Sequence, residues 1–213
     1  MKTTVLIADD HTLVAEGLRY VINAEPDLEV VGYAQNGQEA LRKSLDMSPD
    51  IVLMDNAMPI LNGIEAARLI RKRCPGTQVI MLSMYCDQAH VLRALQAGAR
   101  GYLLKKSVAQ ELVTAIRRVH AGQHYLTRDL AEGVISQVSK APEDPLERLS
   151  SRERQVLQMV AEGHTAIEIG GKLSLSPKTV ETYRSRMMDK LDLHDLAGLI
   201  KFAIQQGVIS IDE

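Results

Sequence analysis

The sequence has few aromatic residues and few cysteines. Tryptophan is absent, and one phenylalanine and six tyrosines supply all the aromatic bulk of the 213 residues. Hydrophobic cores must therefore be built from Leu, Ile, Val, Met and Ala. The two cysteines, Cys74 and Cys86, have no metal-binding spacing, and two thiols do not make the disulfide framework of a small secreted domain.

Long apolar runs and a strong charge imbalance are also missing. No segment approaches the roughly 20 apolar residues that a membrane-spanning helix needs. The first residues lead directly into a predicted strand followed by two acids, unlike a signal peptide, so we expect a cytoplasmic protein with no membrane association. The net charge is −2, and residues 148–211 carry nine basic and seven acidic side chains. Charge alone therefore does not indicate a nucleic-acid-binding protein.

Short apolar runs alternate with amphipathic helical patterns through the N-terminal half of the chain. The predicted strands are Thr4–Ala8, Val30–Tyr33, Ile51–Met54, Val79–Leu82 and Tyr102–Leu104. Helical patterns lie near residues 12–24, 36–46, 63–73, 87–97 and 107–121. This strict alternation predicts an α/β domain with a doubly wound, five-stranded parallel sheet in the order 2-1-3-4-5.

The alternation ends near Gly122, and we place the first domain at residues 1–122. Residues 123–147 contain two prolines and several acids, which is typical of a solvated linker, with one short helical pattern over Leu130–Val138. Residues 148–213 are predicted to form a small all-α domain.

The starts of the four C-terminal helices are marked in the sequence. Ser150 and Thr165 each precede a glutamate by three residues, which is the pattern of a capping box. Ser176 is followed by a proline at the first helical position, and Asp195 stands before the last helical pattern. Short helices joined by tight turns make a compact helical unit.

Polar side chains gather at the carboxyl ends of the predicted strands. Asp9 and Asp10 follow the first strand, Asp55 the third, Ser83 the fourth and Lys105 the fifth. In a parallel sheet these ends lie at one edge, and ligands bind where the strand order reverses. Any one of these residues could merely cap a helix, but five at one edge with complementary chemistry favour a function.

Three neighbouring carboxylates repel one another unless a cation compensates. Mg²⁺, which prefers oxygen ligands, is the cofactor that fits, and Lys105 adds a fixed positive charge. Such a site suits an incoming phosphoryl group. Asp55, central in the sheet, is the best nucleophile, while Asp9 and Asp10 would hold the metal. Ser83 could then donate a hydrogen bond to the phosphoryl oxygen.

Four short motifs contain these polar residues: Leu6-Ile-Ala-Asp-Asp-His, Val52-Leu-Met-Asp-Asn-Ala-Met-Pro, Val79-Ile-Met-Leu-Ser and Ala97-Gly-Ala-Arg-Gly-Tyr-Leu-Leu-Lys. A fifth motif, Asn62-Gly-Ile-Glu-Ala, lies between the second and the third. The five motifs resemble the receiver domain of two-component response regulators over about residues 1–121. The resemblance implies a sensor histidine kinase as phosphodonor. It also implies the following roles: phosphoacceptor Asp55, metal ligands Asp10, Asp55 and the carbonyl of Ala57 with support from Asp9, switch residues Ser83 and Tyr102, and phosphoryl contact Lys105. Asn56 departs from the family, which usually has an apolar residue there.

The segment Ser176–Leu191 is the candidate DNA-binding helix. Its predicted buried stripe is Val180, Tyr183, Met187 and Leu191. The opposite face carries Lys178, Thr182, Ser185 and Asp189, flanked by Glu181 and Arg186. A recognition helix places its N-terminal half against base edges. Taken alone, however, such a charged face more often only meets water.

Two motifs favour DNA: Leu149-Ser-Ser-Arg-Glu-Arg-Gln-Val-Leu and Leu175-Ser-Pro-Lys-Thr-Val-Glu-Thr-Tyr-Arg-Ser-Arg-Met-Met-Asp-Lys-Leu. They resemble the LuxR-type helix-turn-helix over about 148–208, and with the receiver they give the NarL/FixJ layout. The resemblance implies a homodimer on DNA, base contacts from Glu181, Thr182 and Ser185, and backbone contacts from Lys178, Thr179, Arg184 and Lys190. Departures at Ala166, Ile167, Gly170-Gly171 and Tyr183 predict modest DNA affinity or a strong dependence on dimerisation.

Two other functions remain open. The acidic cluster could belong to a Mg²⁺-dependent phosphatase of the aspartyl-phosphate type, but that chemistry usually needs a second acid where Ala57 stands. Alternatively, the first domain could gate a protein–protein contact while the C-terminal helices bind no DNA. We favour a regulator that is not an enzyme, accepts a phosphoryl group on Asp55 and binds promoter DNA.

Overall fold

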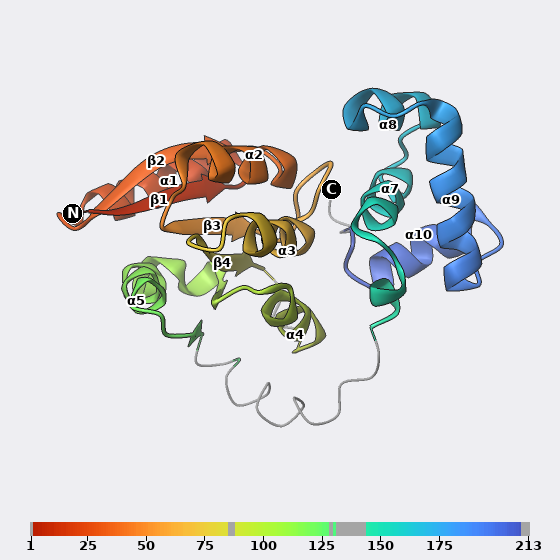
Figure 1. Cartoon of the computed structure of the whole chain (residues 1–213). Helices are drawn as coiled ribbons and strands as arrows, with labels where there is room; N and C mark the ends of the chain where they lie inside the picture. Colours follow the sequence, from red (N-terminus) through yellow and green to blue (C-terminus); the bar gives the residue numbers. More distant parts are fainter. Residues whose placement is uncertain (1, 85–87, 128–129, 131–143, 210–213) are drawn as a thin grey trace. The chain divides into compact units, whose positions relative to one another are not determined.

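The computed structural model describes residues 2–84, 88–127, 130 and 144–209, and the chain divides into two compact units, Met1–Ser139 and Lys140–Glu213 (Figure 1). The N-terminal unit alternates strands and helices. Its strands are β1 (Thr3–Ala8), β2 (Leu28–Ala34), β3 (Ile51–Asp55), β4 (Gln78–Ser83), β5 (Gly101–Leu104) and β6 (Tyr125–Leu126). Its helices are α1 (Thr12–Asn23), α2 (Gly37–Met47), α3 (Gly63–Arg73), α4 (Gln88–Ala97), η1 (Lys105–Ser107) and α5 (Val108–His120).

The sheet is parallel, with the strand order β2-β1-β3-β4-β5-β6. The predicted α/β fold and the order of its first five strands are confirmed. The sixth strand, β6, pairs Tyr125 with Gly101 and Leu126 with Tyr102, within the segment that we interpreted as linker. Two residues carry no detectable periodicity, so a strand of this length has no signal in the sequence.

Helices cover both faces of the sheet. Side chains from α1 and α5 pack on one face against β-strand residues such as Val5, Ile7 and Leu53. Side chains from α2, α3 and α4 pack on the other, against residues such as Leu6 and Met54. Burial on both faces explains why the central strands are continuous apolar runs rather than alternating ones.

The loop after β3 is held by a close backbone contact. A Cβ atom on Gly63, the first residue of α3, would lie 2.0 Å from the carbonyl oxygen of Asp55. The Gly63 amide donates to the carbonyl oxygen of Asn56 at 3.0 Å. Only glycine fits there. Within the same loop, Ile60 has a φ of +72°, a strained conformation for a β-branched residue.

The C-terminal unit consists of helices: η2 (Pro145–Arg148), α7 (Ser151–Ala161), α8 (Ala166–Leu173), α9 (Pro177–Leu191) and α10 (Leu196–Gln205). Both predicted capping boxes form, with Ser150 and Thr165 as the caps. The helix predicted over Leu130–Val138 falls, beyond Leu130, on residues that lie outside those described. Within the described ranges, no helix is both long and apolar enough to cross a membrane.

Candidate functional site

Strand register brings the predicted polar residues to one edge of the sheet. Ala8 lies beside Met54, Asp55 beside Leu82, and Ser83 beside Leu104. Asp9 and Lys105 come directly after Ala8 and Leu104. Residues from four neighbouring strand ends therefore meet at the carboxyl edge, across the β1–β3 boundary where the strand order reverses.

Lys105 joins two of the carboxylates directly. Its Nζ atom lies 2.8 Å from Asp55 Oδ1 and 3.0 Å from Asp9 Oδ2. The side chains of Asp9, Asp55 and Lys105 are 0%, 5% and 16% exposed. Water screens these charges little, so their mutual interactions are strong. The predicted nucleophile, one predicted metal ligand and the predicted phosphoryl contact thus form one buried cluster.

His11 extends this cluster, and the sequence analysis missed it. Its Nδ1 atom lies 2.9 Å from Asp10 Oδ1 and 3.2 Å from Asp9 Oδ1. The charge of Asp10 raises the pKa of His11, against the opposing effect of its burial. The oxygen Asp10 Oδ1 is itself buried and accepts no hydrogen bond among the described residues, so His11 approaches it closely without hydrogen-bond geometry. The only signal was the position of His11 directly after two acids.

The cluster carries an excess of negative charge. Three carboxylates, those of Asp9, Asp10 and Asp55, face one ammonium group, that of Lys105. Burial raises the pKa of Asp55 to about 6; Lys105 opposes this rise, while Asp9 and Asp10 add to it. The orphaned buried oxygen of Asp10 adds a further unsatisfied acceptor. Oxygen ligands with a charge of about −2 in excess suit a divalent cation.

The ligand atoms are close enough for one ion. Single ligand atoms from Asp9, Asp10 and His11 lie within 4.8 Å of one another. Carboxylate oxygens are the donors that Mg²⁺ prefers, whereas imidazole is not typical of Mg²⁺ sites. The carboxylates of Asp9 and Asp10 therefore fit this cation in chemistry and spacing, and their charges also act on the carboxylate of Asp55.

The other predicted residues of this site occupy different positions. Ser83 is the last residue of β4 and is 1% exposed, beside the strand end that precedes Lys105. Tyr102 is fully buried in β5 and packs in the apolar cluster of α2, α3 and α4, so it lies back from the edge. Ala57 is half-buried in the loop two residues after Asp55.

Helix α9 presents the predicted polar face of the second site. The Ser176 side chain accepts a hydrogen bond from the Thr179 amide and caps the helix. Val180 and Met187 are buried, while Tyr183 and Leu191 are half-buried. The exposed residues predicted to contact DNA are Lys178, Glu181, Thr182, Ser185, Arg186 and Lys190.

A shallow pocket of about 360 Å³ marks the N-terminal half of α9. Ser176, Lys178, Thr179, Thr182, Tyr183 and Arg186 line it. Tyr183, which we placed in the buried stripe, therefore also reaches the polar face. The sequence pattern could not show this, because a ring can be packed along its body and exposed at its tip.

Several predicted contacts have partners within the C-terminal unit. Lys190 Nζ lies 2.7 Å from Glu153 Oε2 in α7, at the opposite end of α9 from the pocket. Burial opposes the ionisation of Glu153, but hydrogen bonds from Lys190 and Ser150 outweigh it and lower its pKa. The Thr182 hydroxyl donates to the Lys178 carbonyl oxygen at 2.9 Å. Arg184 Nη1 lies 4.0 Å from Glu181 Oε1.

Comparisons with known proteins match both parts of the chain to known families. Residues 5–117 match the response regulator receiver domain family, and residues 147–203 match the family of bacterial regulatory proteins named luxR. Response regulator UvrY of Escherichia coli K12 is 39% identical over 210 residues, which cover 98% of this chain and 96% of UvrY. Transcriptional regulatory protein LiaR of Bacillus subtilis is 39% identical over 208 residues, which cover 97% of this chain and 99% of LiaR.

A solved structure agrees as well. The LuxR-family two-component response regulator from Aurantimonas sp. SI85-9A1 is 35% identical and superposes with a TM-score of 0.62, covering 66% of this chain and all of that one. The predicted family is therefore confirmed from motifs, fold and relatives together. The chain belongs to the two-component response regulators that join a receiver domain to a LuxR-type DNA-binding domain, which are transcription regulators rather than classical enzymes.

Proposed function

We propose that phosphorylation of Asp55 controls the binding of α9 to promoter DNA. The observation that carries this proposal is the pair of contacts from Lys105 to Asp55 and Asp9, at 2.8 and 3.0 Å. They hold a buried carboxylate beside a fixed positive charge at the sheet edge. The same chain carries an N-capped helix with an exposed polar face.

The phosphoryl donor is a phosphorylated histidine of a sensor kinase. A carboxylate oxygen of Asp55 attacks the phosphorus, the P–N bond breaks as the P–O bond forms, and the leaving imidazole takes up a proton. Lys105 neutralises charge on the transferred oxygens, and Ser83 donates a hydrogen bond to one of them. Tyr102 and Ser83 are the residues whose positions change with the phosphorylation state.

Mg²⁺ is the cofactor of this site. The carboxylates of Asp9, Asp10 and Asp55 and the carbonyl oxygen of Ala57 would hold it. When bound, it offsets the excess negative charge of the cluster and the charge of the arriving phosphoryl group. The burial of the Asp55 carboxylate beside the charges of Asp9 and Asp10 supports this, because buried like charges need a compensating cation.

Helix α9 would lie in the major groove. Glu181, Thr182 and Ser185 would contact base edges, while Lys178, Thr179, Arg184, Arg186 and Lys190 would contact the DNA backbone. A homodimer would place two such helices about one helical turn of DNA apart. We further propose a cytoplasmic location and place the receiver at residues 1–122 and the DNA-binding domain at 148–213, joined by the linker.

Labelling tests the phosphoacceptor. Full-length protein is incubated with Mg²⁺ and radiolabelled acetyl phosphate, and the Asp55→Asn variant is compared with Asp46→Asn, which alters an exposed carboxylate of α2. Wild type and Asp46→Asn should incorporate label that hydroxylamine removes, as expected for an acyl phosphate. Asp55→Asn should incorporate none. Retention of label in Asp55→Asn would reject Asp55 as the phosphoacceptor.

Mobility shifts over a salt series test the DNA face. Lys178→Ala should weaken binding to all sequences alike and reduce the salt slope by about one. Thr182→Ala should instead reduce the discrimination between base pairs, by about 1–3 kcal/mol at the position that Thr182 contacts. Lys201→Ala, on α10, is the control. Binding with neither a salt slope nor a sequence preference would favour a protein-interaction module.

A further inference from the structure

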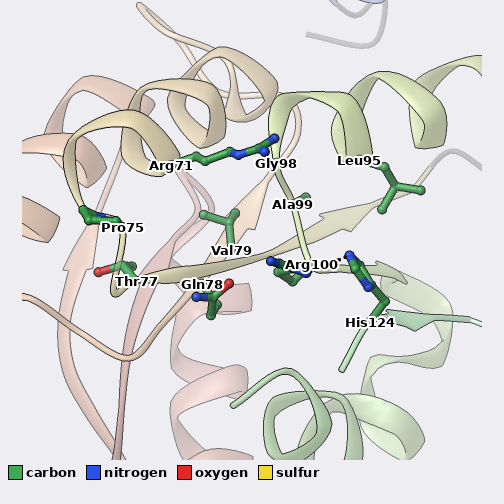
Figure 2. A pocket seen from close by; sticks show the side chains of 10 residues that line it. All are labelled: Arg71, Pro75, Thr77, Gln78, Val79, Leu95, Gly98, Ala99, Arg100 and His124. Atoms are coloured by element: carbon green, nitrogen blue, oxygen red, sulfur yellow. Dashed lines mark hydrogen bonds between the residues drawn. The ribbon is translucent and has the colours of Figure 1, made fainter. Parts of the chain in front are cut away.

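A cavity of about 400 Å³ lies at the end of the receiver sheet opposite the carboxylate cluster (Figure 2). Its lining includes Gln78, the first residue of β4, whereas the cluster adjoins Ser83, the last. Its cationic or ionisable lining residues are Arg71, Arg100 and His124. Apolar lining comes from Val79, Leu95 and Ala99, and no carboxylate lines the cavity among the described residues.

The two arginines have no acidic partner in the part of the chain that the structure describes. The Arg71 side chain takes part in no ion pair or hydrogen bond there. Arg100 Nη1 lies 3.2 Å from His124 Nε2, the contact drawn in Figure 2. Since a guanidinium only donates, this nitrogen of His124 must be the acceptor, and the ring is then neutral. The histidine thus orients Arg100 without neutralising it.

Nearby helix ends offset only part of this positive charge. Helices α3 and α4 end beside the cavity at Arg73 and Ala97. A helix C-terminus carries about half a negative charge, so the two together offset about one of the two guanidinium charges. Some carbonyl groups at these helix ends already accept hydrogen bonds. The Gly98 amide donates to the Leu95 carbonyl oxygen, and the Cys74 amide donates to the Ile70 carbonyl oxygen. The cavity therefore keeps a positive excess.

Gly98 shapes the cationic side of the cavity. Its φ of +107° suits glycine, and a Cβ atom there would lie 2.1 Å from Arg71 Cδ. Because Gly98 has no side chain, the aliphatic part of the Arg71 side chain has room to pass close to the backbone directly after α4. In Figure 2, Arg71 lies on one side of Val79 and Ala99, and the Arg100–His124 pair lies on the other. The arginines thus approach the cavity from different elements.

We propose that this cavity binds the phosphate group of a small phosphorylated molecule. A phosphate monoester carries a charge near −2 and three free oxygens, which match two guanidinium groups better than the single charge of a carboxylate does. The apolar lining would contact the organic part of the ligand. The volume lies within the range of about 300–1,000 Å³ that is common for small-molecule sites.

Nuclear magnetic resonance of the full-length chain tests this proposal. Glycerol 3-phosphate is titrated at constant ionic strength with a chelator present, and glycerate serves as the carboxylate counterpart. The backbone amides of Val79, Gly98, Ala99 and Arg100 should shift. The double variant Arg71→Gln/Arg100→Gln should bind roughly tenfold more weakly or worse. Both arginines are exposed, so this variant should fold, and its own spectrum reports whether it does.

The matched control is Lys72→Gln/Arg73→Gln. It removes two charges from the same end of α3, at exposed residues that do not line the cavity, and should change the affinity by less than about twofold. Four results would each overturn the proposal: no shifts at the cavity, shifts only at α9 or at Lys105, an equal loss in the control, or equally tight binding of glycerate. The single variant Arg100→Gln gives a second measurement if the double variant unfolds.

Discussion

The carboxylate cluster and the polar face of α9 are built in opposite ways. The cluster joins residues as distant in sequence as Asp9 and Lys105, 96 positions apart, and the side chains of Asp9 and Asp55 are buried. The α9 face comes from 15 consecutive residues behind one serine cap and is exposed. Tertiary register creates the first site, whereas local helical periodicity creates the second.

This difference predicts how each site responds to substitution. In the cluster, each charge interacts with several others through a poorly screened interior, so a change alters stability as well as chemistry. On the exposed face, a substitution should alter DNA binding while leaving stability within about 0.5 kcal/mol. The following substitutions test where that division holds, starting with the largest expected effect.

Gly63→Ala should strongly destabilise the receiver. The added Cβ atom would lie 2.0 Å from the Asp55 carbonyl oxygen and 2.9 Å from Met81 Cε. Because backbone is involved, the loop that follows Asp55 must move, and we expect a loss of about 3 kcal/mol or more. Urea denaturation of the receiver, followed by circular dichroism, measures this loss. Gly76→Ala is the control, since nothing lies within 4 Å of its Cβ position; equal effects of the two would refute the argument.

Asp55→Asn should stabilise the receiver in the absence of divalent cations. The pKa of Asp55 is raised from 3.8 to about 6 in the folded protein. Ionisation is therefore harder in the folded state than in the unfolded state, and the wild type loses stability as pH rises from about 4 through 6. The loss at pH 7 should be about 1–2 kcal/mol after allowance for solvent screening.

The amide variant lacks this titration. Its free energy of unfolding should exceed that of the wild type at pH 7 and approach it near pH 4, when both are measured with a chelator present. Asp46→Asn, at an exposed position, should show no such dependence. A wild type that is more stable than Asp55→Asn at pH 7 would contradict the proposed cause of the pKa shift.

Sequence patterns predicted the five longer strands, the α-helices of the described residues, and the edge at which Asp9, Asp55 and Lys105 meet. They succeeded because parallel topology places all strand ends together, whatever the distance along the chain. Patterns could not show that Lys105 bridges Asp9 and Asp55, or that Ile60 takes a left-handed conformation. Such details depend on how close two elements approach, which periodicity does not encode.

The unexpected role of Lys190 illustrates the same limit on α9. Its partner Glu153 is the third residue of α7 and the acidic member of its capping box, and lies 37 positions away. A helical pattern shows which face a residue occupies but not which neighbouring element covers it. Lys190 was grouped with the DNA contacts because of the resemblance to the LuxR-type helix-turn-helix, which does not show what Lys190 contacts within this chain.

Lys190→Met tests whether this residue belongs to the buried or to the exposed kind of site. It should lower the free energy of unfolding of the C-terminal unit by about 1 kcal/mol, because Glu153 is 4% exposed and loses a partner. Hydrogen bonds from Lys190 and Ser150 outweigh burial and lower the pKa of Glu153. The contribution is therefore present above the ordinary pKa of a glutamate and disappears as pH falls through the lowered value.

Lys178→Met is the matched control on the same helix. Lys178 is exposed in the α9 pocket and has no acidic partner among the described residues, so stability should be unchanged while DNA affinity falls. Thermal denaturation and a mobility shift on each variant separate the two effects. Equal stabilities at pH 7 would show that the Lys190–Glu153 pair contributes nothing.

Gly171→Ala should give an effect of at most the same size and of opposite sign. No atom lies within 4 Å of its Cβ position in α8, and alanine favours a helix over glycine by about 1 kcal/mol. The neighbouring Gly170→Ala is the control, since its Cβ would lie 2.7 Å from the Leu175 carbonyl oxygen and should destabilise the unit. Thermal denaturation of the C-terminal unit should thus move in opposite directions for two adjacent glycines. If both substitutions raise the melting temperature, the turn between α8 and α9 can move to accommodate a Cβ atom at Gly170. The close backbone contact at Gly170 would then not limit stability as the contact at Gly63 is expected to do.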